Sequence, residues 1–151
     1  MSTMYINCDV PTEVSEEDFD YLNGLTFNLS ERGYLQCGSK EHYLEYLHII
    51  VAKRMGLDTT KLIDHKDRIK LNNQRYNLRE ATKSQNAANS KLSVLNTSGH
   101  KGVIFDKERQ KWIAQIKVNY KNIFLGRFED YEKACKIRDD AVVKYFGEFS
   151  T

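Results

Sequence analysis

The stretch Ile63–Asn89, IDHKDRIKLNNQRYNLREATKSQNAAN, decides how the middle of this chain folds. Lys61–Asp64 has the apolar character of a strand that is about to end. Asn72-Asn73 supplies residue types that favour a turn, and apolar character resumes at Leu78. This order predicts two strands joined by a polar loop.

A helix is predicted directly after the second strand. Thr82, with Gln85 three residues later, has the pattern of a capping box, in which each side chain bonds to the other residue's backbone N–H. A helix that begins there places Asn86 in its first turns, with Asn89 on nearly the same face. The whole stretch therefore predicts a strand, a loop, a second strand and a helix.

Three side chains of this stretch suit phosphodiester cleavage, which needs an activated water molecule and a cation. The imidazole of His65 is a potential general base, because its ordinary pKa of roughly 6.5 leaves it partly neutral at physiological pH. Asp64 offers a hard oxygen ligand for one divalent metal ion, Mg²⁺ or Mn²⁺, and the Asn86 carbonyl offers a second. The cations expected to attract a phosphate backbone to this site are Arg68, Lys70, Arg75 and Arg79.

Each of these residues also has an ordinary interpretation. An Asp-His pair is more often a turn or surface pair, Asn77 alone would be a loop residue bonding to its own backbone, and Asn86 a polar helix residue. The combination of strand, loop and capped helix favours a site, since it brings Asp64 and His65 into plausible proximity with Asn86.

Residues 42–91 resemble the H-N-H, or ββα-metal, nucleases, especially the homing endonucleases of phages and group I introns. The resembling features are Asp64-His65-x-Asp67, Asn72-Asn73, Asn77-Leu78-Arg79, Thr82, Asn86, Asn89 and the upstream Leu47-His48-Ile49-Ile50. The resemblance implies an α+β fold with a ββα-metal module. It also implies that His65 is the general base, that Asp64 and Asn86 hold one divalent ion, and that Asn77 orients the His65 ring. For His42 and His48 we expect structural roles.

The region before this module is short of basic residues and predicts small elements. Ser15–Leu22 has a Ser followed by acidic residues, as at the start of a helix. Leu25–Phe27, Tyr34–Cys37 and His42–Leu47 are brief apolar or aromatic runs that predict strands, and His48–Met55 predicts a helix ended by Gly56.

The last third of the chain has a different pattern. Gly102–Asp106, Trp112–Val118 and Asn122–Phe128 predict three antiparallel strands, and Tyr131–Phe146 predicts a helix on their apolar face. The helix positions expected to face the sheet are Ala134, Ile137, Ala141, Val142 and Tyr145. The other sheet face is expected to present Lys101, Lys111, Gln115, Lys117, Lys121 and Arg127.

A sheet face of this composition either enters the major groove of DNA or is merely solvated. Four short motifs resemble the APETALA/ethylene-response-factor DNA-binding domain. They are Lys101-Gly102-Val103, Lys111-Trp112-x-Ala114, Leu125-Gly126-x-Phe128 and Tyr145-Phe146-Gly147. That resemblance implies DNA contacts from the sheet residues Lys101, Gln115, Lys117 and Phe124. Ile104 and Asp106 stand where the plant domains commonly have base-reading Arg residues, so no sequence preference is implied.

Charge and composition agree with a nucleic-acid partner. Net charge is −7 over residues 1–47, +6 over 48–97 and +3 over 98–151, and clustered cations gain affinity for phosphates by releasing counterions. The chain is 40% hydrophobic and 29% charged with one Pro, which indicates a folded protein. No apolar run is long enough for a membrane span and no signal-peptide pattern begins the chain, so we expect an intracellular protein without membrane contact. Cys8, Cys37 and Cys135 are expected to be reduced.

The sequence therefore predicts a metal-dependent DNA endonuclease of phage or intron type. Its expected parts are an acidic region at 1–47, an H-N-H module at 48–91, a linker at 92–98 and a DNA-binding domain at 99–151. A monomer would nick one strand of double-stranded DNA, and a dimer would cut both. The alternatives are a non-catalytic DNA-binding regulator with a degenerate H-N-H module, and a nuclease that cleaves RNA.

Overall fold

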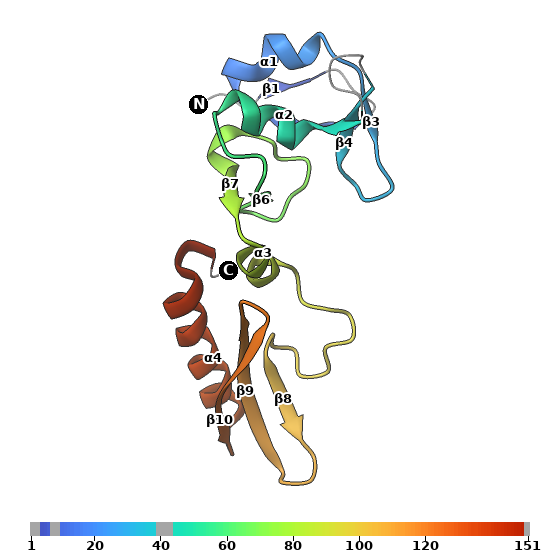
Figure 1. The fold of residues 1–151 in the computed structure, drawn as a ribbon. Coiled ribbons are helices and arrows are strands. Elements are labelled where there is room, and N and C mark those ends of the chain that lie inside the picture. The colour runs from blue at the N-terminus through green and yellow to red at the C-terminus, as the bar shows by residue number, and fades with distance from the viewer. Residues whose placement is uncertain (1–3, 7–9, 39–43, 150–151) are drawn as a thin grey trace. The chain divides into compact units, whose positions relative to one another are not determined.

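The computed structural model describes residues 4–6, 10–38 and 44–149 (Figure 1). The chain divides into two compact units, residues 1–81 and 82–151, so the division falls inside the predicted 48–91 module. The predictions for Cys8 and His42 lie outside the described residues. In the part that is described, no helix combines the length and the apolar character needed to cross a membrane.

The first unit is a set of short elements around two helices, at positions close to those predicted. As described, its elements are β1 (Met4–Tyr5), β2 (Glu13–Val14), α1 (Glu16–Asn23), β3 (Phe27–Leu29), β4 (Leu35–Cys37), β5 (Glu45–Tyr46), α2 (Leu47–Arg54), β6 (Leu62–His65), the 3₁₀ turn η1 (Arg75–Asn77) and β7 (Leu78–Ala81). The strands pair antiparallel as β1-β2, as β3-β4-β5 and as β6-β7.

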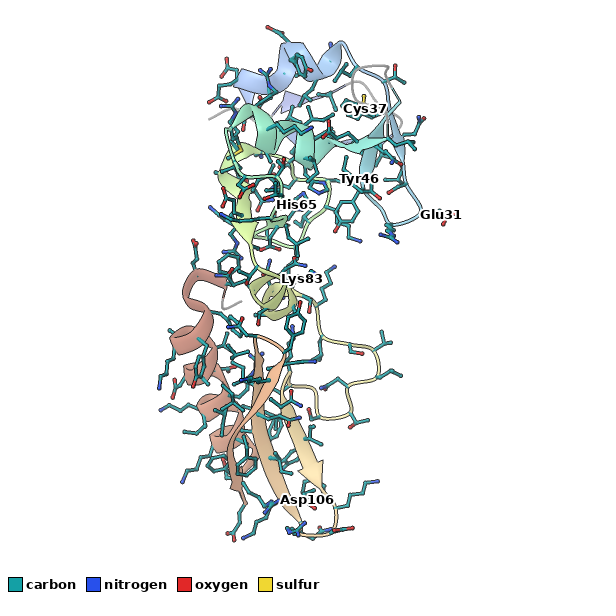
Figure 2. All side chains as sticks on the ribbon, viewed as in Figure 1. Glu31, Cys37, Tyr46, His65, Lys83 and Asp106 are labelled. Carbon is teal, nitrogen blue, oxygen red and sulfur yellow. The ribbon has the colours of Figure 1, made fainter. Side chains whose placement is uncertain are left out.

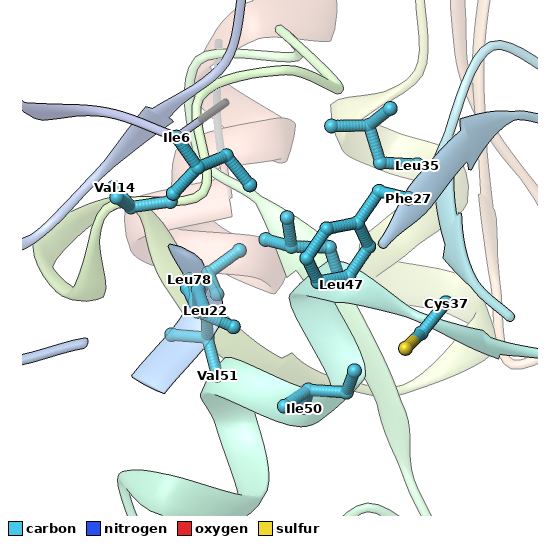
Figure 3. Close-up of a cluster of buried hydrophobic side chains, with 10 residues drawn as sticks. All are labelled: Ile6, Val14, Leu22, Phe27, Leu35, Cys37, Leu47, Ile50, Val51 and Leu78. Atoms are coloured by element: carbon cyan, nitrogen blue, oxygen red, sulfur yellow. The ribbon is translucent and has the colours of Figure 1, made fainter. Parts of the chain in front are cut away.

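Helix α2 organises the core of this unit. Its residues Leu47, Ile50 and Val51 are buried, and they share one apolar cluster with Leu22 of α1 and Phe27 of β3 (Figure 3). The helix packs against β4 and β5 as well as against β6 and β7. It therefore joins the small sheet to the β6-β7 hairpin that carries the residues of interest.

The β6-β7 hairpin fixes which residues lie opposite one another. Asp64 pairs with Arg79 and His65 pairs with Leu78. Leu78 belongs to the buried cluster, which anchors the hairpin to the core at the point where β6 ends. The loop from residue 66 to residue 74, followed by η1, returns the chain to β7.

The second unit contains the three-stranded antiparallel sheet that the sequence predicts. Its described elements are α3 (Lys83–Asn89), β8 (Val103–Asp106), β9 (Lys111–Val118), β10 (Lys121–Phe128), α4 (Tyr131–Phe146) and the 3₁₀ turn η2 (Gly147–Phe149), with strand order β10-β9-β8. Val103, Ala114 and Ala134 form the buried centre between the sheet and α4. Trp112 packs between Phe105 and Tyr131, with ring centroids 4.8 and 4.6 Å away.

Two details of this unit differ from prediction, and a third describes the predicted linker. Tyr145 is 41% exposed and Phe146 is buried instead, because the inward face of α4 continues from Val142 by four residues. Lys121 pairs with Val118 across the β9-β10 turn and so lies on the α4 side of the sheet, not on the outer face. The predicted linker is partly structured, since Ser98 accepts a hydrogen bond from the Tyr131 hydroxyl at 2.9 Å.

Candidate active site

His65 is held at the buried end of β6 by the side chain of Asn73. The ring is 6% exposed, and its Nε2 lies 3.2 Å from Asn73 Oδ1. The amide nitrogen of Asn73 donates to Thr12 Oγ1 at 3.0 Å and to the Lys70 carbonyl at 3.4 Å. The Thr12 hydroxyl donates its own hydrogen to the Leu71 carbonyl at 2.6 Å.

These bonds determine how the imidazole is protonated. A carbonyl oxygen only accepts, so Asn73 presents its amide hydrogens to Thr12 and Lys70 and its oxygen to His65. The ring must then donate from Nε2, and in the neutral imidazole the lone pair is on Nδ1. Nδ1 is therefore the nitrogen of His65 that can take up a proton.

His65 belongs to a cluster of four rings that joins β6 to α2 and to the small sheet. The ring centroid of His48 lies 5.2 Å from that of His65 in an edge-on arrangement, and His48 stacks on Tyr46 at 5.6 Å. Tyr34 lies 5.1 Å from His48 and 6.1 Å from His65. His65 and Tyr46 are labelled in Figure 2. The burial of His48 agrees with the structural role expected for it.

Burial keeps both imidazoles neutral. Removal from water lowers the pKa of His65, although the hydrogen bond to Asn73 and the charges of Asp67 and Asp64 act in the opposite direction. The pKa of His48 falls to about 3 because of burial and the charge of His65. Burial raises the pKa of Tyr34, and the Asp64 charge adds to that rise. A neutral His65 is the form that a general base requires.

Asp64 is buried beside its cross-strand partner Arg79. Arg79 Nε donates to Asp64 Oδ2 at 3.0 Å, and Nη2 of the same guanidinium lies 3.0 Å from that oxygen. The side chains are 6% and 8% exposed. The arginine neutralises a carboxylate that burial would otherwise disfavour. Arg79, expected from the sequence to meet DNA, is thus a partner of the carboxylate.

Asn77 organises the loop after His65 through bonds of its side chain within that loop. Its Nδ2 donates to Asp67 Oδ1 at 2.9 Å and to the Asn72 carbonyl at 2.7 Å, and its Oδ1 accepts from the Asp67 backbone at 3.1 Å. The ring of His65 is oriented by Asn73. The sequence predicts Asn73 as a turn residue. Its position in the doublet Asn72-Asn73 is the feature that could have indicated its contact with His65.

Two of the other predicted cations in this unit are engaged within the protein. Arg75 donates to both carboxylate oxygens of Asp18, at 2.7 and 2.8 Å. Lys70 donates to the Arg32 carbonyl at 2.7 Å and lies 4.6 Å from the centre of the Tyr34 ring. Arg68 is exposed in the loop, with a φ of 64°.

Of the two metal ligands that the sequence predicts, Asp64 is a buried carboxylate of the first unit. Asn86 is an exposed residue of α3 in the second unit. Its predicted neighbour Asn89 is buried, so the two do not share an environment. Within the described ranges, no group of three or more His, Cys, Asp or Glu residues is placed to hold a metal. Mg²⁺ needs few protein ligands because it retains water molecules and binds substrate phosphates.

The outer face of the second unit's sheet carries most of the residues of that unit that the sequence predicts to contact DNA. The register places Gln115 opposite Phe124 and Lys117 opposite Asn122 on this face, and Phe124 is 60% exposed. Arg127 lies 3.4 Å from Asp106 and 6.0 Å from the Phe124 ring centre. Lys111, also on this face, lies 3.3 Å from Glu129. The exposed ring and polar groups are thus side by side.

Lys101 is placed differently from the other predicted DNA contacts. Its ammonium donates to the carbonyls of Ala87 at 2.6 Å, Ala88 at 3.1 Å and Ser90 at 3.0 Å, and to the Ser90 hydroxyl at 2.8 Å. Ala87 and Ala88 lie in the last turn of α3 and Ser90 is its C-cap residue, and the Ala87 carbonyl also accepts from the Ser90 N–H and hydroxyl. Lys101 thus caps α3, and its ammonium would have to leave these oxygens to reach a phosphate.

Comparison with known proteins agrees with this geometry. Residues 45–88 match the family model described as HNH endonuclease, a segment that includes α2 and the β6-β7 hairpin. Searches among curated proteins and among solved structures gave no match. The segment that carries Asp64, His65 and Asn73 is thus similar to HNH endonucleases.

Proposed function

We propose that this protein is a metal-dependent DNA endonuclease of the homing or nicking type, in which His65 is the general base. The observation that carries this proposal is the bond between His65 Nε2 and Asn73 Oδ1 at 3.2 Å, which leaves Nδ1 as the proton acceptor of a buried neutral ring. That ring lies beside Asp64 in a segment similar to HNH endonucleases.

In the proposed reaction, His65 Nδ1 accepts a proton from the attacking water molecule as the water oxygen bonds to phosphorus and the bond between phosphorus and the 3′ oxygen breaks. The released 3′ oxygen takes up a proton from solvent. The products are a 5′-phosphate and a 3′-hydroxyl. Asp64 and, as the sequence predicts, Asn86 would hold a divalent Mg²⁺ or Mn²⁺ ion, which would supply positive charge for the leaving oxygen and the phosphate. Arg79 donates a hydrogen bond to Asp64 from its guanidinium Nε.

The second unit is proposed to bind duplex DNA through its outer sheet face. Lys111, Lys117 and Arg127 are suited to phosphates, and Gln115 is suited to a base edge. Phe124 supplies an exposed apolar contact. The DNA contacts of this face and its likeness to the APETALA/ethylene-response-factor domain are proposals from the sequence. The module limits of 48–91 and 99–151 are proposals of the same kind.

The decisive test is nicking of supercoiled plasmid by the wild-type protein and by His65→Ala, each with Mg²⁺, with Mn²⁺ and with a chelator. We expect metal-dependent open-circle product from the wild type only, with duplex binding by fluorescence anisotropy retained in the variant. His100→Ala is the matched control, since this imidazole lies 3.2 Å from Asp139 in the second unit. Binding without cleavage under all conditions would favour a regulator instead.

A further inference from the structure

The segment before α1 makes direct contact with the loop that holds His65. Glu13 N donates to the Leu71 carbonyl at 2.9 Å, and Asn73 N donates to the Glu13 carbonyl at 2.8 Å. The neighbouring Thr12 is 1% exposed, and its hydroxyl lies between Leu71 and Asn73. Thr12 and Glu13 both lie outside the family match at residues 45–88.

The Thr12 hydroxyl has one possible arrangement of its hydrogen. It donates to the Leu71 carbonyl at 2.6 Å, so its oxygen accepts from Asn73 Nδ2 at 3.0 Å. If the Asn73 amide were turned over, its Oδ1 would face the Thr12 oxygen, whose hydrogen is bonded to the Leu71 carbonyl. The same Oδ1 would also face the Lys70 carbonyl, which can only accept. Both neighbours then oppose the turned amide.

We propose that Thr12 is a positioning residue for the nuclease reaction: through Asn73 it keeps the proton of the neutral His65 ring on Nε2 and the lone pair on Nδ1. The inference rests on the proposed function of His65. A chain of three buried side chains, from Thr12 to Asn73 to His65, thus connects the N-terminal segment to Nε2 of the reacting ring.

The tautomer is measured directly by long-range ¹H–¹⁵N correlation on protein labelled with ¹⁵N in its histidine rings, in chelator at about pH 8, above the ordinary histidine pKa of about 6.5. His65→Ala identifies the signals of His65. We expect the wild-type proton on Nε2. A proton on Nδ1 in the wild type would overturn the inference, whatever the variants do.

Thr12→Val removes the hydroxyl at nearly constant size. We expect part of the His65 population to move its proton to Nδ1 and the nicking rate at saturating DNA to fall at least about tenfold, within the range of general-base effects. Thr12→Ser keeps the hydroxyl and should restore both. Thr60→Val is the control, because it removes a hydroxyl that bonds to Asp58 in an exposed turn.

The outcomes separate this inference from the proposed function. A folded Thr12→Val protein with an unchanged tautomer, or with a changed tautomer and undiminished nicking, would refute the positioning role. If the wild type nicks no DNA with either metal, the nuclease proposal and the role in it both fail. The tautomer would then still show whether Thr12 and Asn73 orient the ring.

Discussion

Asp18 of α1 holds the guanidinium of Arg75 by two hydrogen bonds, from Nε at 2.7 Å and from Nη2 at 2.8 Å. Asp18 is fully buried and also accepts from Arg54 Nε at 2.7 Å. The Ser15 hydroxyl adds a bond from the Arg75 backbone N–H at 2.9 Å. The acidic segment therefore fixes η1 and the loop beside His65, which gives the N-terminal negative charge a structural role.

Asp18→Asn is expected to destabilise the first unit by roughly 2–3 kcal/mol, below the range for a fully buried pair because both arginines keep some contact with water. The loss arises because two guanidiniums remain without their counter-charge. Urea unfolding followed by far-UV circular dichroism measures it. Asp20→Asn, an exposed position on the same helix, is the control. Equal midpoints for the two variants would contradict this prediction.

The burial of His48 predicts acid sensitivity. The folded protein keeps this ring neutral down to a pKa of about 3, whereas the unfolded chain takes up a proton near the ordinary value of 6.5. The unfolded state then binds more protons, so stability falls as pH drops from 6.5 toward 3, by up to about 1.4 kcal/mol per pH unit. The groups around this ring are Tyr34, Tyr46 and the neutral His65.

His48→Phe tests this prediction, because phenylalanine keeps a ring in the cluster but does not titrate. The free energy of unfolding, measured in urea at several pH values between 4 and 6.5, should fall less steeply with decreasing pH in the variant. The difference between the two slopes should correspond to about one proton. Protonation of Asp18, whose pKa is lowered against the effect of burial by hydrogen bonds from Arg75 and Arg54, destabilises both proteins alike below pH 3.8. Identical slopes above pH 4 would show that His48 is not the group responsible.

Local patterns in the sequence were sufficient to predict most elements of the fold. The capping box of Thr82 and Gln85 forms with both of its bonds, because capping depends only on residues three apart. Alternation in β9 similarly placed Ala114 and Ile116 in the core. Ser15 is the exception: it precedes α1 as predicted, yet its hydroxyl bonds to Arg75 and not to its own helix.

The candidate site was only partly predictable for the same reason. Asp64 and His65 stand together in the sequence, so their pattern is visible. The residue that orients the ring, Asn73, is itself oriented by Thr12, which lies 61 positions earlier. A single sequence also does not reveal that the partners of Arg75 and Lys101 are Asp18 and the end of α3. Both cations were therefore assigned to DNA.

Gly102 is expected to resist substitution. Its φ is +77°, and a Cβ there would clash with the backbone oxygen of Gln115 and lie 3.3 Å from Arg138. Gly102→Ala should destabilise the second unit by roughly 1–3 kcal/mol through backbone strain, and the clash with the Gln115 oxygen should add to that loss. Fluorescence of Trp112, the one tryptophan in the chain, reports that unit. Gly147→Ala is the control, because its φ is +53° but a Cβ there would meet no atom within 4 Å. A comparable loss of stability in this variant would mean that the close contact between a Cβ at Gly102 and the Gln115 oxygen is unimportant.

Variants of Lys101 and Lys117 distinguish a cation that stabilises the fold from a cation that contacts DNA. Lys101→Met should remove a donor from the end of α3, speed amide hydrogen exchange at residues 86–90 and reduce nicking, because α3 carries Asn86. Lys117→Met, on the exposed sheet face, should leave exchange unchanged. It should reduce the slope of log affinity against log salt by about 0.9, the value for one lost phosphate contact. If Lys101→Met reduces that slope instead and leaves exchange in α3 unaltered, then Lys101 contacts DNA, as the sequence alone suggests.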